Sequence, residues 1–131
     1  AVIAKFKNIG DQAKFHGFKN QDFVQEKMKR ASIIVIPSIW EEPFGLVAAE
    51  AMSNGMGIIA SEIGGIPEIV KDNGILIKDI NKKKLENALI DLISDDNKRK
   101  NLQRKSWANF KFFAKDSSKK LDIYRKIILS R

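Results

Sequence analysis

Residues 33–53 read IIVIPSIWEEPFGLVAAEAMS, and this stretch decides the fold. The continuous β-branched run Ile33–Ile36 is typical of a strand that is buried on both faces of a parallel sheet. Pro37 ends the strand, and Pro43 is expected to open a helix as a first-turn proline that runs to about Ser53. A buried strand followed by a loop and a helix is the repeating unit of doubly wound α/β folds.

The same alternation of strands and helices continues along the chain. Further strands are expected at 13–16, 57–60 and 75–77, and helices at 21–30, 66–70, 82–93, 97–113 and 116–129. Asn20 and Asn81 are expected to cap the helices that follow them. This order predicts an α/β, Rossmann-like parallel sheet with helices on both faces. The chain opens on a helix end at 1–9, closed by Gly10, whereas such a domain normally opens on a strand. We therefore expect residues 1–131 to be a single domain, and a fragment whose first strand is missing.

Composition excludes several classes of protein. The chain has 131 residues, of which 44% are hydrophobic, so it is not a disordered tail. It has no cysteine and one histidine, His16, which excludes disulfides, thiolate metal sites and sites with several imidazoles. No apolar run is long enough to span a membrane, and residues 1–10 do not resemble a secretory signal. These absences fit a cytoplasmic protein.

The net charge of +8 is unevenly distributed. Residues 1–65 hold seven basic and seven acidic side chains, whereas residues 66–131 hold seventeen and nine. Most of the excess lies in the predicted helices of 97–131. A basic surface attracts phosphates of nucleotides, nucleic acids or lipid headgroups, and a solvated lysine-rich face explains the same charge. Docking to an anionic membrane surface, on the inner face of the membrane, is one function that such helices suit.

The candidate functional side chains are two glutamates, one at each end of residues 42–50. The expected helix is apolar on every side for most of its length, so we expect it to be buried. Glu42 precedes this helix, and Glu50 lies within it as the exception. The helix N-terminus between them offers free backbone N–H groups, and Gly45 allows a ligand to approach the backbone closely. Glu50 needs either a cation or a pair of donors such as a ribose diol. The residues alone leave a binding site and a structural ion pair equally open.

The order of these motifs resembles the C-terminal, donor-binding domain of family 4 retaining glycosyltransferases, which have the GT-B fold. The matching segments are Pro37-Ser38, Glu42-Pro43-Phe44-Gly45-Leu46-Val47, Glu50-Ala51-Met52, Gly55, Ile58-Ile59-Ala60, Gly64-Gly65, Glu68-Ile69-Val70 and Asn73-Gly74-Ile75-Leu76. The resemblance covers nearly the whole chain and is densest between residues 33 and 77. It also implies that the partner is a nucleotide diphosphate sugar, with UDP or GDP as the nucleotide.

The resemblance implies a role for each matching residue. Glu50 would bind the ribose hydroxyls, and Glu42 would contact the hydroxyls of the donor sugar as the catalytic residue. The remaining donor-binding residues would be Phe44, Gly45, Leu46 and Val47 at the sugar and distal phosphate, and Phe18 and Lys19 near the base. The resemblance implies no metal and no other cofactor, because basic side chains and helix N-termini carry the charge of the leaving group.

The resemblance also implies retention of configuration in the transfer of a hexose-type sugar to a glycan or lipid-linked acceptor, as in polysaccharide or lipopolysaccharide biosynthesis. Glu42 could be a covalent nucleophile by the logic of retaining hydrolases, but the resemblance favours a sugar-positioning role. The family's phosphate-binding Arg and Lys would lie upstream of Ala1, and the N-terminal acceptor domain is missing. We therefore expect these residues to bind a donor weakly and to be inactive alone.

Other functions remain as alternatives at this stage. A nucleotide-sugar epimerase-like domain shares the fold. A basic nucleic-acid-binding module is disfavoured, because the aromatic residues follow helical stripes and no nucleic-acid motif is present. Asp95-Asp96 could suggest a metal, but the neighbouring Ser94 and Asn97 indicate a helix end and a cap. His16 precedes Gly17 at the end of the expected strand and is interpreted as structural.

Overall fold

The computed structural model describes residues 12–110, and its centre is a parallel sheet. Three strands, β1 (Ile33–Ile36), β2 (Gly57–Ser61) and β3 (Gly74–Ile77), lie in the order β1-β2-β3. In the register, Ile33 pairs with Gly57, and Ile58 pairs with Gly74. The α/β class and the parallel arrangement predicted from the sequence are confirmed.

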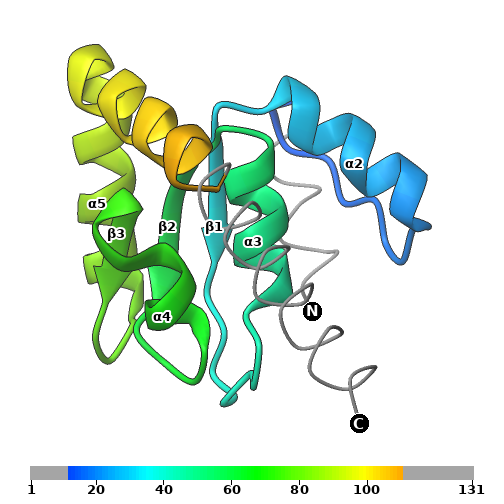
Figure 1. Cartoon of the computed structure of the whole chain (residues 1–131), viewed down its shortest axis with the longest axis horizontal. Coiled ribbons are helices and arrows are strands. Elements are labelled where there is room, and N and C mark those ends of the chain that lie inside the picture. The colour runs from blue at the N-terminus through cyan, green and yellow to red at the C-terminus, as the bar shows by residue number, and fades with distance from the viewer. Residues whose placement is uncertain (1–11, 111–131) are drawn as a thin grey trace, which may run out of the picture.

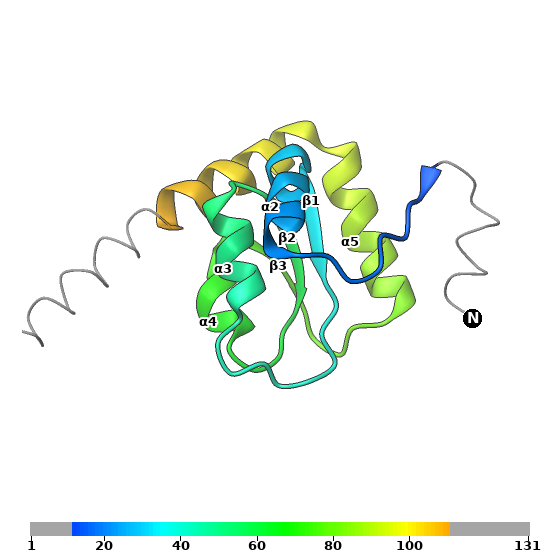
Figure 2. The same ribbon diagram turned by 90° about the vertical axis from the view of Figure 1, so that its right-hand side faces the viewer.

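Helices cover both faces of this sheet, as Figures 1 and 2 show. The described helices are α2 (Gln21–Arg30), α3 (Leu46–Ser53), α4 (Ile66–Val70), the short 3-10 turn η2 (Lys71–Asn73), α5 (Lys82–Ser94) and a helix at 96–110. Asn20 caps α2 by accepting from Phe23 N, and Asn81 caps α5 by accepting from Lys84 N. Both asparagine caps were predicted, because this side chain satisfies an amide that the helix itself leaves unpaired.

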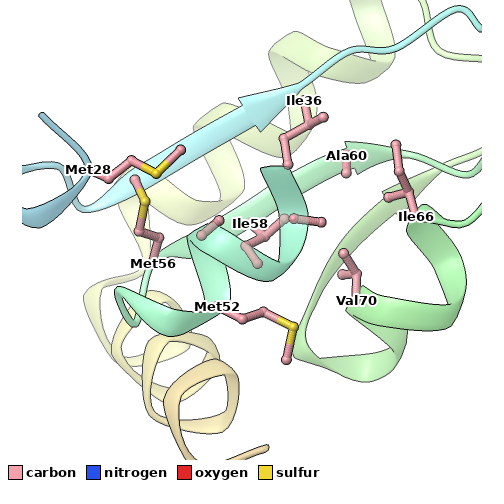
Figure 3. Close-up of a cluster of buried hydrophobic side chains, with 10 residues drawn as sticks. Met28, Ile36, Met52, Met56, Ile58, Ala60, Ile66 and Val70 are labelled. Carbon is pink, nitrogen blue, oxygen red and sulfur yellow. The ribbon is translucent and has the colours of Figure 1, made fainter. Parts of the chain in front are cut away.

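One hydrophobic core lies between the sheet and the helices α3 and α4 (Figure 3). Alternate strand residues such as Ile36, Ile58 and Ala60 point to this side, as the two-residue period of a strand requires. The helices contribute the buried side chains Ala48, Ala51, Met52, Ile66 and Val70, and α2 adds Met28. Each strand therefore supplies one half of its side chains to this layer.

The other half of the strand side chains packs against α5. Ile59 and Ile77 are buried there with Ala88 and Leu92 of α5. Because successive strand residues face opposite sides, a continuous apolar run such as 33–36 fits only a sheet that is covered twice. The two cores explain why these strands show no alternation of apolar and polar residues.

The helix at 96–110 lies across the amino ends of the strands, in yellow to orange at the top of Figure 1. Gln103 Nε2 donates to the carbonyl of Ser32, just before β1, at 3.0 Å. The fully buried hydroxyl of Ser106 donates at 3.0 Å to the carbonyl of Asn73, just before β3. Leu102 packs against one core and Phe110 against the other. This helix therefore ties both layers together at one edge of the sheet.

The loop after β1 is held at the opposite edge by the glycine turn after β2. Gly65 N donates to the carbonyl of Glu42 at 2.7 Å. A Cβ at Gly65 would lie 2.5 Å from Pro43 O, and one at Gly64 would lie 2.5 Å from Glu42 O. Only glycine allows two backbone segments to approach this closely. The Gly64-Gly65 pair therefore fixes the position of the loop that carries Glu42.

The structure corrects three of the sequence predictions. Residues 13–16 do not form a strand. The helix predicted from Pro43 begins instead at Leu46, because the segment before it is bound to the glycine turn and Gly45 adopts a left-handed φ of 57°. That helix is also not buried on all sides, since Leu46 is 69% exposed. The elements predicted at 1–9 and 116–129 lie outside the described residues.

Replacing Ser106 by alanine is expected to lower the free energy of unfolding by about 1–2 kcal/mol. The substitution removes the Ser106 donor from the Asn73 carbonyl and leaves that acceptor in a buried position. Urea denaturation of both proteins measures the difference. Ser94→Ala is the matched control, because Ser94 makes a similar hydroxyl-to-carbonyl bond to Ile90 at an exposed position. It should change stability by less than about 0.5 kcal/mol, and equal effects of the two substitutions would contradict the prediction.

Gly65→Ala is expected to displace the loop that carries Glu42 and to cost about 1–3 kcal/mol of stability. The backbone of Gly65, with φ −80°, accommodates alanine, so the effect arises from the collision with Pro43 O. In a Trp107→Phe background Trp40 is the sole tryptophan, and its emission reports movement of the loop. Gly17→Ala is the control for the emission alone, because its φ of +65° strains an alanine, whereas a Cβ there meets nothing within 4 Å. An unchanged Trp40 spectrum in Gly65→Ala would show that the glycine turn does not hold the loop.

Candidate functional site

The predicted site lies at the carboxyl edge of the sheet, at the lower end of Figure 1. The loops that follow β1 and β2 meet there through the bond between Gly65 N and Glu42 O. This edge is where open α/β sheets bind ligands, because the loops of neighbouring strands converge on it. Along the chain, the N-terminus of α3 at Leu46 lies between the two predicted glutamates, Glu42 and Glu50.

Glu42 occupies a half-buried position in the loop after β1. The hydroxyl of Ser38 donates to Glu42 Oε1 at 2.7 Å, so one carboxylate oxygen is fixed by the loop itself. Among the ion pairs formed within residues 12–110, none includes Glu42. The carboxylate thus retains acceptor capacity on Oε2, which fits a group that contacts hydroxyls.

The N-terminus of α3 has no side-chain cap. Its N-cap is Gly45, which has no side chain to satisfy the first amides, and the first helical bond is Ala49 N to Gly45 O. The amides of Leu46, Val47 and Ala48 therefore have no acceptor within the helix. Since the helix begins later than predicted, these amides replace those of Phe44 and Gly45 as the free donors. Such a cluster of N–H groups attracts anions and phosphates.

Glu50 lies one turn further along α3 and is half buried. Gln21 Nε2 donates to Glu50 Oε1 at 2.8 Å, across 29 residues of sequence. No ion pair of the described residues includes Glu50, so the structural ion pair that the sequence left open is not found there. Sequence reasoning missed Gln21, because nothing in the local pattern links the first residue of α2 to the middle of α3.

The segment predicted near the base precedes α2. Phe18 is fully exposed, and Lys19 Nζ lies 5.5 Å from the ring centroid of Phe23. His16 packs edge-on against the same ring at 5.1 Å, which agrees with its interpretation as structural. Gln21, two residues after Lys19, reaches Glu50, so the start of α2 lies beside α3. Glu42, Phe44, Gly45, Leu46, Val47 and Glu50 lie on α3 or the loop before it, Lys19 contacts α2 through Phe23, and Phe18 is exposed.

The remaining sequence candidates have structural partners. Asp95 Oδ1 accepts from Lys98 N at 2.9 Å and caps the helix at 96–110, while Asp96 pairs with Arg99 and Lys100. The hydrogen bond from Lys100 and the nearby charge of Arg99 lower the pKa of Asp96. Within residues 12–110 no three histidine or carboxylate side chains gather as metal ligands. The helices in that range are all too short or too polar to cross a bilayer.

Comparison with known proteins identifies a family. The family described as "Glycosyl transferases group 1" matches residues 2–107. The uncharacterized glycosyltransferase MJ1607 of Methanocaldococcus jannaschii is 37% identical over 106 residues, which are 72% of this chain and 27% of that protein. The chain thus spans about a quarter of this relative's length.

Two solved structures share the fold. Sucrose-phosphate synthase from Thermosynechococcus elongatus superposes with a TM-score of 0.79 and 25% identity, covering 99% of this chain and 34% of that one. Anabaena Alr3699/HepE, solved in complex with UDP-glucose, gives a TM-score of 0.73 and 26% identity, covering 83% of this chain and 30% of that one. The GT-B resemblance expected from the sequence is confirmed. The chain belongs to the group 1 glycosyl transferases, as a C-terminal domain of that family.

Proposed function

We propose that this chain is the donor-binding domain of a retaining glycosyltransferase that uses a UDP- or GDP-linked hexose. The observation that carries the proposal is the open N-terminus of α3, which lies between two carboxylates that have no cationic partner among the described residues. A nucleotide diphosphate sugar has an anionic centre flanked by a ribose diol and a sugar ring. The site offers amide donors in its middle, which suit the diphosphate. It offers carboxylate acceptors on either side, which suit the hydroxyls of the ribose and of the sugar.

The diphosphate would lie against the amides of Leu46 and Val47. Glu50 is four residues beyond the first residue of α3, or about 6 Å along the helix axis. This separation suits a ribose attached to the diphosphate. Gln21 would hold Oε1 of Glu50 and leave Oε2 for the ribose hydroxyls. The exposed Phe18 and Lys19, next to Gln21, would border the base.

Glu42 would position the sugar. Its Oε1 is engaged by Ser38, and its Oε2 can accept from a sugar hydroxyl. Negative charge develops on the diphosphate as the bond to the anomeric carbon breaks, and the amides at the start of α3 would stabilise that charge without a metal. We propose front-face transfer with retention, in which Glu42 orients the sugar and forms no covalent bond to it.

The activity belongs to a longer protein. The chain spans 27% of MJ1607, and the acceptor domain would supply the rest of the cleft. We propose that these residues alone bind donor without transferring it. The acceptor would be a glycan or a lipid-linked glycan of polysaccharide or lipopolysaccharide synthesis, and the protein would work in the cytoplasm, peripherally at the inner membrane face.

Glu50→Ala is expected to weaken donor binding at least tenfold, because charge-assisted hydrogen bonds of this kind contribute about 1.5–3 kcal/mol. The measurement is a thermal-shift panel of UDP, GDP and their hexose conjugates. Ligand at a hundred times its Kd should stabilise the parent chain by about 2.7 kcal/mol. Glu86→Ala, which removes an exposed carboxylate of α5 on the other face of the sheet, is the control and should retain the full shift. The ribose assignment fails if Glu50→Ala retains it too.

Gln21→Leu is expected to weaken donor binding about threefold to tenfold, because Glu50 loses the donor that orients it. Gln21→Glu should weaken binding further, since a second carboxylate then repels the first. Isothermal titration with the best nucleotide of the panel measures both. Gln25→Leu is the control on the same helix, because Gln25 contacts Asn54 rather than Glu50. Equal affinities of the Gln21 and Gln25 variants would contradict a positioning role.

A further inference from the structure

A hollow lies at the amino edge of the sheet, away from the candidate donor site. Its volume is about 850 Å³. The wall is made by Lys29 near the end of α2, by the turn 53–55 after α3, and by one face of the helix at 96–110. In Figure 1 the end of α2 and this helix lie at the same upper end of the molecule. We name this hollow the amino-edge pocket.

The amino-edge pocket and the donor site lie at opposite ends of α3. The pocket includes the turn that follows Ser53, whereas the donor site uses the amides that begin at Leu46. An eight-residue helix is about 12 Å long, so one small ligand does not occupy both places. A ligand in the pocket would therefore leave the donor site accessible.

Three cationic side chains and no carboxylate line the pocket. They are Lys29, Lys100 and Arg104. Lys100 pairs with Asp96, with Nζ and Oδ2 2.5 Å apart, but no acidic group of the described residues pairs with Lys29 or Arg104. Within residues 12–110 Arg104 uses only Nε, which donates to Lys100 O at 3.3 Å, so no described residue occupies its two terminal nitrogens, which suit a bidentate contact. Like charges from two helices that meet in one hollow favour an anion between them.

Trp107 gives the pocket a flat apolar wall. Its side chain lines the hollow and is 46% exposed, although tryptophan normally buries a large apolar surface. The Cβ of Trp107 lies against Gly55. Cations beside a partly exposed indole suit a ligand that carries both a negative group and an apolar or planar body.

We propose that the amino-edge pocket binds a phosphate-bearing ligand, with the phosphate held by Lys29, Lys100 and Arg104 and the attached body against Trp107. Arginine matches phosphate because its planar fork donates two parallel hydrogen bonds, and the lysines add charge from both sides. The phosphate can belong to a soluble compound or to a lipid headgroup. The proposal does not rest on the proposed donor site, because the two share no residue.

The test uses the intrinsic fluorescence of Trp107. The chain has two tryptophans, Trp40 and Trp107. Trp40→Phe therefore makes Trp107 the sole reporter and removes the tryptophan emission of the loop that carries Glu42. Titration with inorganic pyrophosphate at low salt should change the Trp107 emission with saturation. A second titration uses vesicles of phosphatidylglycerol in phosphatidylcholine, with pure phosphatidylcholine vesicles as the reference. A response to pyrophosphate indicates a soluble source, and a blue shift with anionic vesicles alone indicates a headgroup.

The site variant is Lys29→Gln combined with Arg104→Gln in the same background. It should bind the responding probe about tenfold more weakly, since two exposed cationic contacts are lost. Lys78→Gln with Lys82→Gln is the control, because it removes the same charge from exposed positions after β3 and should leave the affinity unchanged. Far-UV circular dichroism verifies that both variants fold, and Lys29→Arg should retain binding if the site variant does not fold. The proposal is overturned if neither probe changes Trp107 emission, or if the site and control variants weaken binding equally.

Discussion

The contact of Gly65 with the Glu42–Pro43 backbone is the constraint on which the candidate site depends. Gly65 N donates to Glu42 O, and a side chain at Gly64 or Gly65 would collide with the loop. Because of this contact, the loop after β1 first passes over the Gly64-Gly65 turn that follows β2, and α3 begins only after it. The position of Glu42, the left-handed Gly45 and the open amides of α3 all follow from that path. Gly64 and Gly65 therefore determine the geometry of the site through backbone contacts alone.

Much of the fold was predictable because local sequence patterns indicate its strands and helices. The β-branched run at 33–36 and the apolar run at 57–60 indicated strands that are covered on both faces, and each has side chains in both cores. Asn20 and Asn81 indicated helix starts, because an asparagine side chain can accept from the backbone N–H of the residue three positions later. Both side chains do so. These signals act within a few residues, so one sequence is enough to interpret them.

What the sequence did not reveal depends on contacts between distant segments. Pro43 has the local properties of a first helical residue, but the helix starts at Leu46, since tertiary contact with Gly65 overrides that preference. Gln21 reaches Glu50 across 29 residues, and no periodicity connects them. The amino-edge pocket is likewise formed by α2, the turn after α3 and the helix at 96–110, which are far apart in the chain.

The partner of Glu50 bears on what this carboxylate does. A half-buried carboxylate that served only stability would gain most from a cation, because an ion pair offsets the cost of desolvating the charge. Gln21 instead gives Glu50 one neutral hydrogen bond to Oε1. That bond orients the carboxylate without neutralising it and leaves Oε2 as a strong acceptor. The helix N-terminus one turn away attracts an anion, while Glu50 repels one, so a ligand that satisfies both must be anionic at one end and carry hydroxyl donors at the other. A nucleotide diphosphate meets both requirements in the arrangement we propose, in which its diphosphate would lie at Leu46 and its ribose at Glu50.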